Sequence, residues 1–173
     1  MDAMECLLGR RSIRSFTDRK IEREDLEKIV KAAYHAPSAM NRQSSRFIVI
    51  RKADVIEELA ECLRKKLNRD SGYNFYKPNA LILCTAPALN TNGVEDCAVA
   101  MENIMLAAHS LGIGSVWINQ FKGVCNDVDV RSLLRRVDVP DSYVVCGCAA
   151  LGYAADDALR NYEKNPNVVS WIE

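Results

Sequence analysis

The sequence has no long apolar run and no excess of charge of either sign. No run of apolar residues approaches the ~18 needed to cross a bilayer as a helix, and the longest, Ala80 to Leu83 and Val144 to Leu151, suit buried strands. The chain carries 23 basic and 23 acidic residues, so the positive field that drives nucleic-acid binding is missing. We therefore expect neither a membrane nor a nucleic acid as partner.

Targeting signals and metal motifs are also missing. The first six residues include acidic ones and lack the basic-then-apolar order of a secretion signal. The seven cysteines are scattered without a C-x-x-C pair, which favours a reducing, cytoplasmic location. Cys146 and Cys148 stand two apart in an apolar run and are expected on one strand face as small hydrophobic residues; a redox pair is the alternative. With only His35 and His109, no histidine-rich metal site is expected.

The length, composition and apolar spacing of the sequence suit a single domain over residues 1–173. About half of the residues are hydrophobic, and a chain of this length buries roughly 70% of its surface, so it needs no disulfide or metal to fold. Apolar spacing predicts helices near 22–36, 56–67, 92–111 and 130–137, and strands near 47–50, 80–85, 113–118 and 143–151. Asn92 is interpreted as the N-cap of the longest of these helices, and Glu95 is expected to complete a capping box. This pattern predicts helices layered on a sheet.

The C-terminal segment does not fit this core. Residues 152–166 are polar and irregular, yet Val168 to Ile172 form a strand-like run that is too apolar to be left in water. Such a run is most simply paired with the edge of another sheet. We therefore expect an exchange of this segment between two subunits.

The first cluster of interest runs from Gly9 to Phe16, after a short apolar helix that Gly9 can terminate. It holds three arginines (Arg10, Arg11, Arg14) and two serines. A guanidinium presents a rigid fork of donors that matches a phosphate. The segment therefore indicates an anion site, and a solvated basic turn is the alternative.

The second cluster joins a helix to a strand over Ala36 to Gln43. Its residues favour turns, and the amides of Asn41 and Gln43 can donate and accept hydrogen bonds together. Such groups suit the polyhydroxy or ring edges of a cofactor. The alternative is an ordinary capped C-terminus of a helix, which would have the same composition.

The third cluster, Leu111 to Gln120, has two glycines that let backbone approach a ligand, and Trp117 brings a flat apolar surface. Asn119 and Gln120 follow where the strand ends. No G-x-G-x-x-G opens a helix here, so this is not a dinucleotide fingerprint. A tight turn with a packed Trp117 is the alternative.

The order of these clusters resembles the FMN-dependent nitroreductase family over nearly the full chain. The stretches that carry the resemblance are Arg10 to Phe16, Ala36 to Gln43, Glu102 to Ala108 leading into Leu111 to Ile118, and Ala150 to Tyr153 followed by Arg160. The resemblance implies an α+β fold with a central, mostly antiparallel sheet flanked by helices. It also implies an intertwined homodimer with exchanged C-terminal segments and one FMN in each of two interface clefts.

The same resemblance implies that NADH or NADPH reduces the FMN, which then reduces a nitroaromatic or quinone-like small molecule in a ping-pong cycle. Arg10 and Ser12 would meet the FMN phosphate and ribityl chain together with Arg160, and Arg14 would lie toward the N1/O2 edge of the ring. The other subunit would supply the second cluster, and the third would face the ring with a backbone N–H near N5. The full implied set is Arg10, Arg11, Ser12, Arg14, Pro37, Ser38, Ala39, Asn41, Trp117, Ile118, Asn119, Gln120 and Arg160.

Alternative functions share this site. Ene reduction, reductive dehalogenation, or flavin binding without turnover would need the same residues, because the flavin carries the chemistry. This chain has Ser44-Ser45-Arg46 where many relatives have Pro-Trp, and it is compact for the family. We therefore expect an open cleft with a partly polar wall that admits acceptors of different size.

Overall fold

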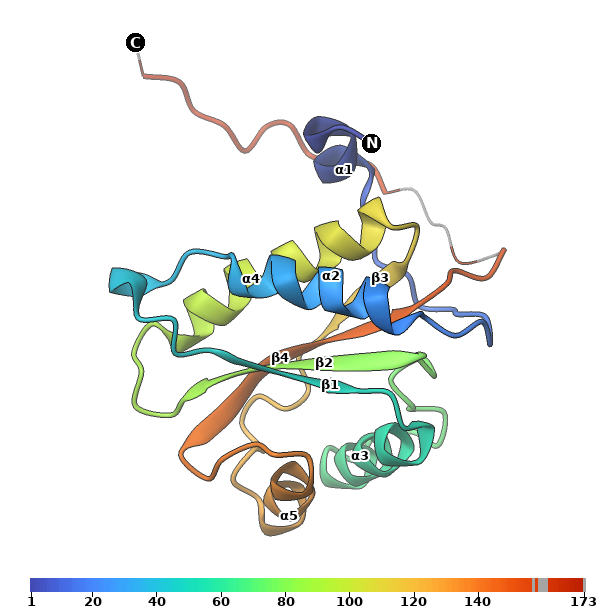
Figure 1. Ribbon diagram of the computed structural model, residues 1–173, viewed down its shortest axis with the longest axis vertical. Helices are drawn as coiled ribbons and strands as arrows, with labels where there is room; N and C mark the ends of the chain where they lie inside the picture. Colours follow the sequence, from blue (N-terminus) through green and yellow to red (C-terminus); the bar gives the residue numbers. More distant parts are fainter. Residues whose placement is uncertain (157, 159–161, 173) are drawn as a thin grey trace.

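The computed structural model describes residues 1–156, 158 and 162–172. A four-stranded antiparallel sheet in the order β1-β2-β4-β3 lies between two layers of helices (Figure 1). The α+β class and the antiparallel sheet are therefore confirmed. The elements are α1 (Ala3–Gly9), α2 (Arg23–Tyr34), the 3-10 helix η1 (Ala39–Asn41), β1 (Arg46–Ile50), α3 (Ala53–Lys66), β2 (Ala80–Pro87), α4 (Gly93–Ser110), β3 (Gly114–Ile118), α5 (Val128–Arg136) and β4 (Tyr143–Gly152).

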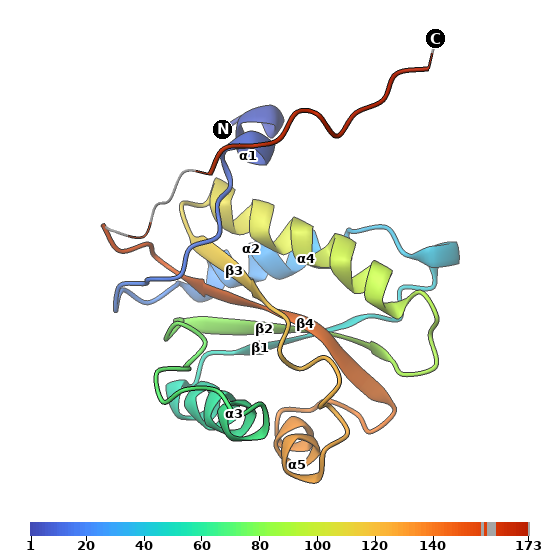
Figure 2. The same cartoon turned by 180° about the vertical axis from the view of Figure 1, so that it is seen from behind.

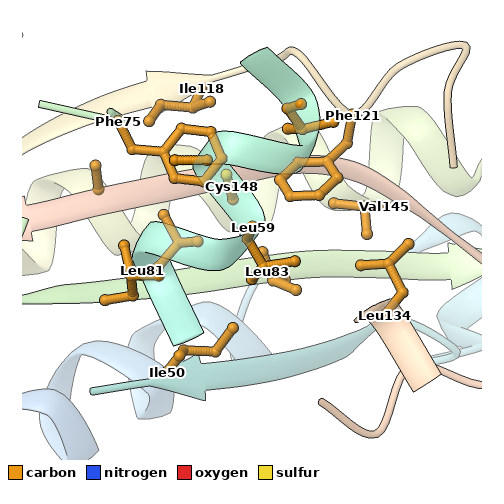
Figure 3. Close-up of a cluster of buried hydrophobic side chains, with 14 of the residues drawn as sticks. Ile50, Leu59, Phe75, Leu81, Leu83, Ile118, Phe121, Leu134, Val145 and Cys148 are labelled. Atoms are coloured by element: carbon orange, nitrogen blue, oxygen red, sulfur yellow. The ribbon is translucent and has the colours of Figure 1, made fainter. Parts of the chain in front are cut away.

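The two faces of the sheet carry separate apolar cores. Helices α2 and α4 cover one face, and α3 and α5 cover the other (Figures 1 and 2). On the α3/α5 side, the rings of Phe75 and Phe121 lie 6.0 Å apart over Leu59 and Cys148 (Figure 3). On the α2/α4 side, Ile29 and Met101 are fully buried. Because both of their faces are covered, the central strands β2 and β4 consist of continuous apolar runs.

Strand β4 contains an irregularity that overturns one expectation from the sequence. The register between β2 and β4 shifts so that Gly147 pairs with Cys84, whereas Val145 pairs with Thr85. Cys146 is the extra residue of this β-bulge, and a bulge reverses which face the following residues address. As a result, Cys148 packs in the α3/α5 core and Cys146 packs on the α2/α4 side. The prediction that both thiols share one face is wrong.

The capping box expected at Asn92 is wrong as well. Asn92 precedes α4, but its side chain caps nothing, because the backbone at φ −102° and ψ 9° is not the extended conformation of a capping residue. The chain enters α4 through a turn in which Asn90 Oδ1 accepts from the Asn92 N–H at 3.1 Å.

The segment that follows α1 lies beside the start of β3, at the edge of the sheet. Ser12 forms an isolated parallel bridge with Ser115, and the Ile13 N–H donates to the Ser115 carbonyl at 2.9 Å. Gly114 allows this approach, because a Cβ there would lie 3.0 Å from the Ile13 side chain. Ser12 and β3 are therefore neighbours although they are far apart in sequence.

The C-terminal residues 162–172 extend away from the rest of the chain (Figures 1 and 2). Trp171 is 83% exposed and Ile172 is 99% exposed. Val168 to Ile172 form no strand with the sheet of their own chain, so exchange with another subunit stays a prediction. Within the described ranges, no helix is long and apolar enough to span a bilayer, and no three metal-ligating side chains gather.

Candidate functional site

Arg10 and Arg11 lie where α1 ends, beside the last turns of α4. Arg11 Nη1 donates to the carbonyls of Leu8 (2.6 Å) and Arg10 (2.9 Å), so it folds back on the end of α1. Arg10 Nε lies 3.7 Å from Glu102 Oε1 on α4. Glu102 is half-exposed, so this ion pair contributes little to folding stability.

Two guanidinium nitrogens here lack a partner. Arg10 Nη1 and Arg11 Nε are buried, and neither finds an acceptor among the described residues. A buried donor that is left unpaired costs about 1–3 kcal/mol, and more when it is charged. Burial, and then the charges of Arg10 and Arg11, lower the pKa of the neighbouring His109. The site therefore holds two permanent positive charges and unpaired donors, as an anion site requires.

The third cluster lies along the same edge as Ser12. Trp117 is 37% exposed and packs over Gly147, where a Cβ would come within 2.5 Å of the indole Nε1. Trp117 and Asn119 line a cavity of about 350 Å³, and Trp117, Ile118 and Gln120 line a second of about 90 Å³. Gln120 Oε1 is buried without a partner in the described chain. Ser12 therefore lies beside the start of β3, whereas the cavity of Trp117 and Asn119 also contains Val94 and Ala98 from the first turns of α4.

The second cluster forms a tight loop that is closed on itself. Met40, Asn41 and Gln43 have left-handed φ values of 52°, 52° and 48°. Ser38 Oγ accepts from the Gln43 N–H at 2.9 Å, and Gln43 Nε2 donates to Asn41 Oδ1 at 2.8 Å. Pro37 and Asn41 are exposed, so the loop presents them outward.

Asp96 anchors this loop and was missed in the sequence. Its side chain is on α4 and only 6% exposed, and Oδ1 accepts from the Ala39 N–H at 2.8 Å. Asn90 Nδ2 approaches the other oxygen at 3.4 Å. An acidic residue in the first turn of a helix is common, so no local signal distinguished it.

The loop and the arginines lie at opposite ends of α4. Asp96, which holds the loop, is in the first turn, whereas Leu106, whose carbonyl accepts from Cys6 Sγ at 3.3 Å, is near the last. At about 1.5 Å per residue, Asp96 and His109 are separated by about 20 Å. A single chain therefore does not unite Pro37 to Asn41 with Arg10 to Arg14. Arg160 lies outside the described residues.

Comparison with known proteins identifies the family. Residues 7–153 match the nitroreductase family. The chain belongs to this family. A nitroreductase with bound FMN from Bacteroides fragilis has the same fold, with a TM-score of 0.92, 30% identity and full coverage of both chains.

Two curated relatives agree with this assignment. An Archaeoglobus fulgidus protein, named provisionally as an NADH dehydrogenase/NAD(P)H nitroreductase, is 36% identical over 90% of this chain and 87% of its own length. The FMN reductase [NAD(P)H] of Bacillus subtilis is 26% identical over 92% of this chain and 68% of its own length. The nitroreductase resemblance stated from the sequence is confirmed.

Proposed function

We propose that this nitroreductase family member is an NAD(P)H-dependent FMN oxidoreductase that reduces nitroaromatic or quinone-like molecules in a ping-pong cycle. The observation that carries the proposal is the pair of buried, unpartnered guanidinium nitrogens on Arg10 and Arg11 beside Ser12. A phosphate is an acceptor that satisfies such donors. FMN has this group, and the similar Bacteroides fragilis structure has FMN bound.

The chain's own residues position and shield the cofactor. When bound, FMN supplies the redox chemistry by taking two electrons from NAD(P)H and passing them to the acceptor. Arg10, Arg11 and Ser12 would hold the phosphate end, and the backbone of Trp117 to Gln120 would face the ring. Arg14, which is exposed on the segment that passes from the start of β3 to the end of β4, would stabilise negative charge at the N1/O2 edge.

A homodimer completes the site in this proposal. When the α4 helices of two chains lie antiparallel across a two-fold axis, the loop at the start of one α4 meets the arginines at the end of the other. Pro37, Ser38, Ala39 and Asn41 then come from the partner. Exposed apolar residues on α4 and α1 support such a contact: Val94, Val99, Met4, Leu7 and Leu8.

The C-terminal segment is the second element of the proposed dimer. Removal of residues 163–173 is expected to shift the protein from dimer toward monomer, because Val168, Trp171 and Ile172 are exposed in the single chain and need a partner surface. Light scattering coupled to size-exclusion chromatography measures the mass. A truncated protein that stays fully dimeric contradicts the exchange. Arg160 is retained in this truncation, so its proposed role at the phosphate is tested separately.

The function itself is tested by absorbance spectroscopy. The purified protein is expected to be yellow, and NADH or NADPH is expected to bleach the flavin band under anaerobic conditions. Addition of a nitroaromatic or a quinone then restores the band. A colourless protein that does not take up FMN contradicts the cofactor, and a yellow protein that neither nucleotide bleaches is a flavin-binding module without turnover.

A further inference from the structure

Three cysteines from different elements converge on the α2/α4 side of the sheet. They are Cys84 on β2, Cys97 on α4 and Cys146 at the bulge of β4, and all three are free thiols in or against the same apolar core. The bulge is what brings Cys146 there, because regular alternation would have placed it with Cys148 on the other face.

The thiols of Cys97 and Cys146 lie in or against the same apolar core. Interaction with the Cys146 thiol, and then burial, raise the pKa of Cys97. The same interaction is the main cause of the lowered pKa of Cys146, which the backbone of Ala86 lowers further. Cys146 is therefore the thiol of the pair that loses its proton more readily.

The two thiols differ in access. Cys146 is half-buried and lines the cavity of about 350 Å³ that also contains Trp117 and Asn119. Cys97 is only 1% exposed, and its sulfur lies 3.7 Å from Ser45 Oγ. A small reagent in the cavity can therefore reach Cys146 directly, whereas Cys97, in the same core, is shielded from it.

The other partly exposed cysteines lack this environment. Cys6 donates its S–H to the Leu106 carbonyl at 3.3 Å, and a thiolate would lose that bond. Burial raises the pKa of Cys62. Since the thiolate is the nucleophile in thiol oxidation, neither has the activation seen at Cys146.

We propose that Cys146 is a hydroperoxide-reactive thiol and that Cys97 is its resolving partner, so that the pair closes an intramolecular disulfide between β4 and α4. The Cys146 thiolate attacks one oxygen of hydrogen peroxide, the O–O bond breaks, and a sulfenic acid and hydroxide form. The Cys97 sulfur then attacks the Cys146 sulfur, the S–O bond breaks, and water leaves. Overall, two thiols lose two hydrogens and one peroxide becomes two waters. The step itself uses no flavin, but Trp117 and Asn119 of the proposed flavin site line the cavity that gives access to Cys146, so the reaction is measured both with FMN bound and after its removal.

The test treats the purified full-length protein with a small excess of hydrogen peroxide. Intact mass spectrometry is expected to show the loss of two hydrogens per chain, and non-reducing peptide mapping is expected to link the peptides of Cys97 and Cys146. Dithiothreitol should reverse the change. A disulfide that links other cysteines, or oxidation of Cys6 or Cys62 while Cys146 remains a free thiol, overturns the proposal.

Two variants separate the roles of the thiols. In Cys97→Ser the sulfenic acid cannot be resolved, so dimedone is expected to label Cys146; in wild type this labelling is at least about tenfold lower. Cys84→Ala is the matched control, because Cys84 is a buried neighbour that the proposal leaves out, and it should form the disulfide as wild type does. Equal labelling of wild type and Cys97→Ser, or loss of the disulfide in a folded Cys84→Ala, contradicts the assignment.

Discussion

Replacement of Arg10 by alanine is expected to weaken FMN binding about 10- to 100-fold. Arg10 Nη1 is buried without an acceptor in the described chain, and a shielded, charge-assisted hydrogen bond to phosphate contributes about 1.5–3 kcal/mol. The apo protein should melt within a few degrees of wild type, because the only ion pair described for Arg10 is the long contact to half-exposed Glu102.

Fluorescence titration of the apo protein with FMN measures this effect. Arg10→Lys keeps the charge but loses the fork of donors, so its affinity should fall between wild type and Arg10→Ala. Arg23→Ala is the control, since Arg23 forms an exposed i,i+4 pair with Glu27 far from the site. If Arg10→Ala and Arg23→Ala bind FMN equally tightly, the phosphate does not lie at Arg10.

The element order could be predicted because local patterns determine it. Helices α2 and α3 bury one stripe of residues each and keep charged residues outside, and acidic Glu24 and Asp25 occupy the first turn of α2. β2 and β4 are apolar runs bounded by turn residues. These signals depend on spacing within a single element, so they can be read without knowledge of the fold.

Features set by contacts between elements could not be predicted. The bulge at Cys146 depends on the register of β4 against β2, and nothing in the run Val144 to Leu151 marks it. Cys97 and Cys146 share one core only because of that bulge. The failure of Asn92 as a side-chain cap has the same origin, because Asn90 determines how the chain enters α4.

The candidate site was predicted in pieces. Arg10 and Trp117 were each singled out from residue type, and the bridge between Ser12 and Ser115 shows that the first and third clusters touch at those two residues. That the loop of Pro37 lies at the other end of α4 could not be read from composition. This separation is the physical reason why the proposed site needs two chains.

Loss of the buried carboxylate of Asp96 is expected to lower both stability and FMN affinity. In Asp96→Ala the Ala39 N–H loses its acceptor, which costs about 1–3 kcal/mol, or about 2–12 °C in melting temperature for a chain of this length. The loop, with Met40 and Asn41 in left-handed conformations, then loses the bond that ties it to α4. Because the proposed dimer uses this loop at the partner's FMN, affinity should fall about tenfold.

Two further variants decide whether Asp96 acts through the loop. Asp96→Asn retains a side-chain oxygen that can accept from the Ala39 N–H, so it should recover most of the lost FMN affinity. Glu95→Ala removes an exposed acidic residue from the same helical turn. This variant should leave both the melting temperature and the FMN affinity unchanged. Thermal melting of the apo protein and FMN titration of all three variants measure the outcome. If Asp96→Ala loses stability but binds FMN like Glu95→Ala, then Asp96 supports the fold alone, and the loop of Ala39 is not part of the flavin site.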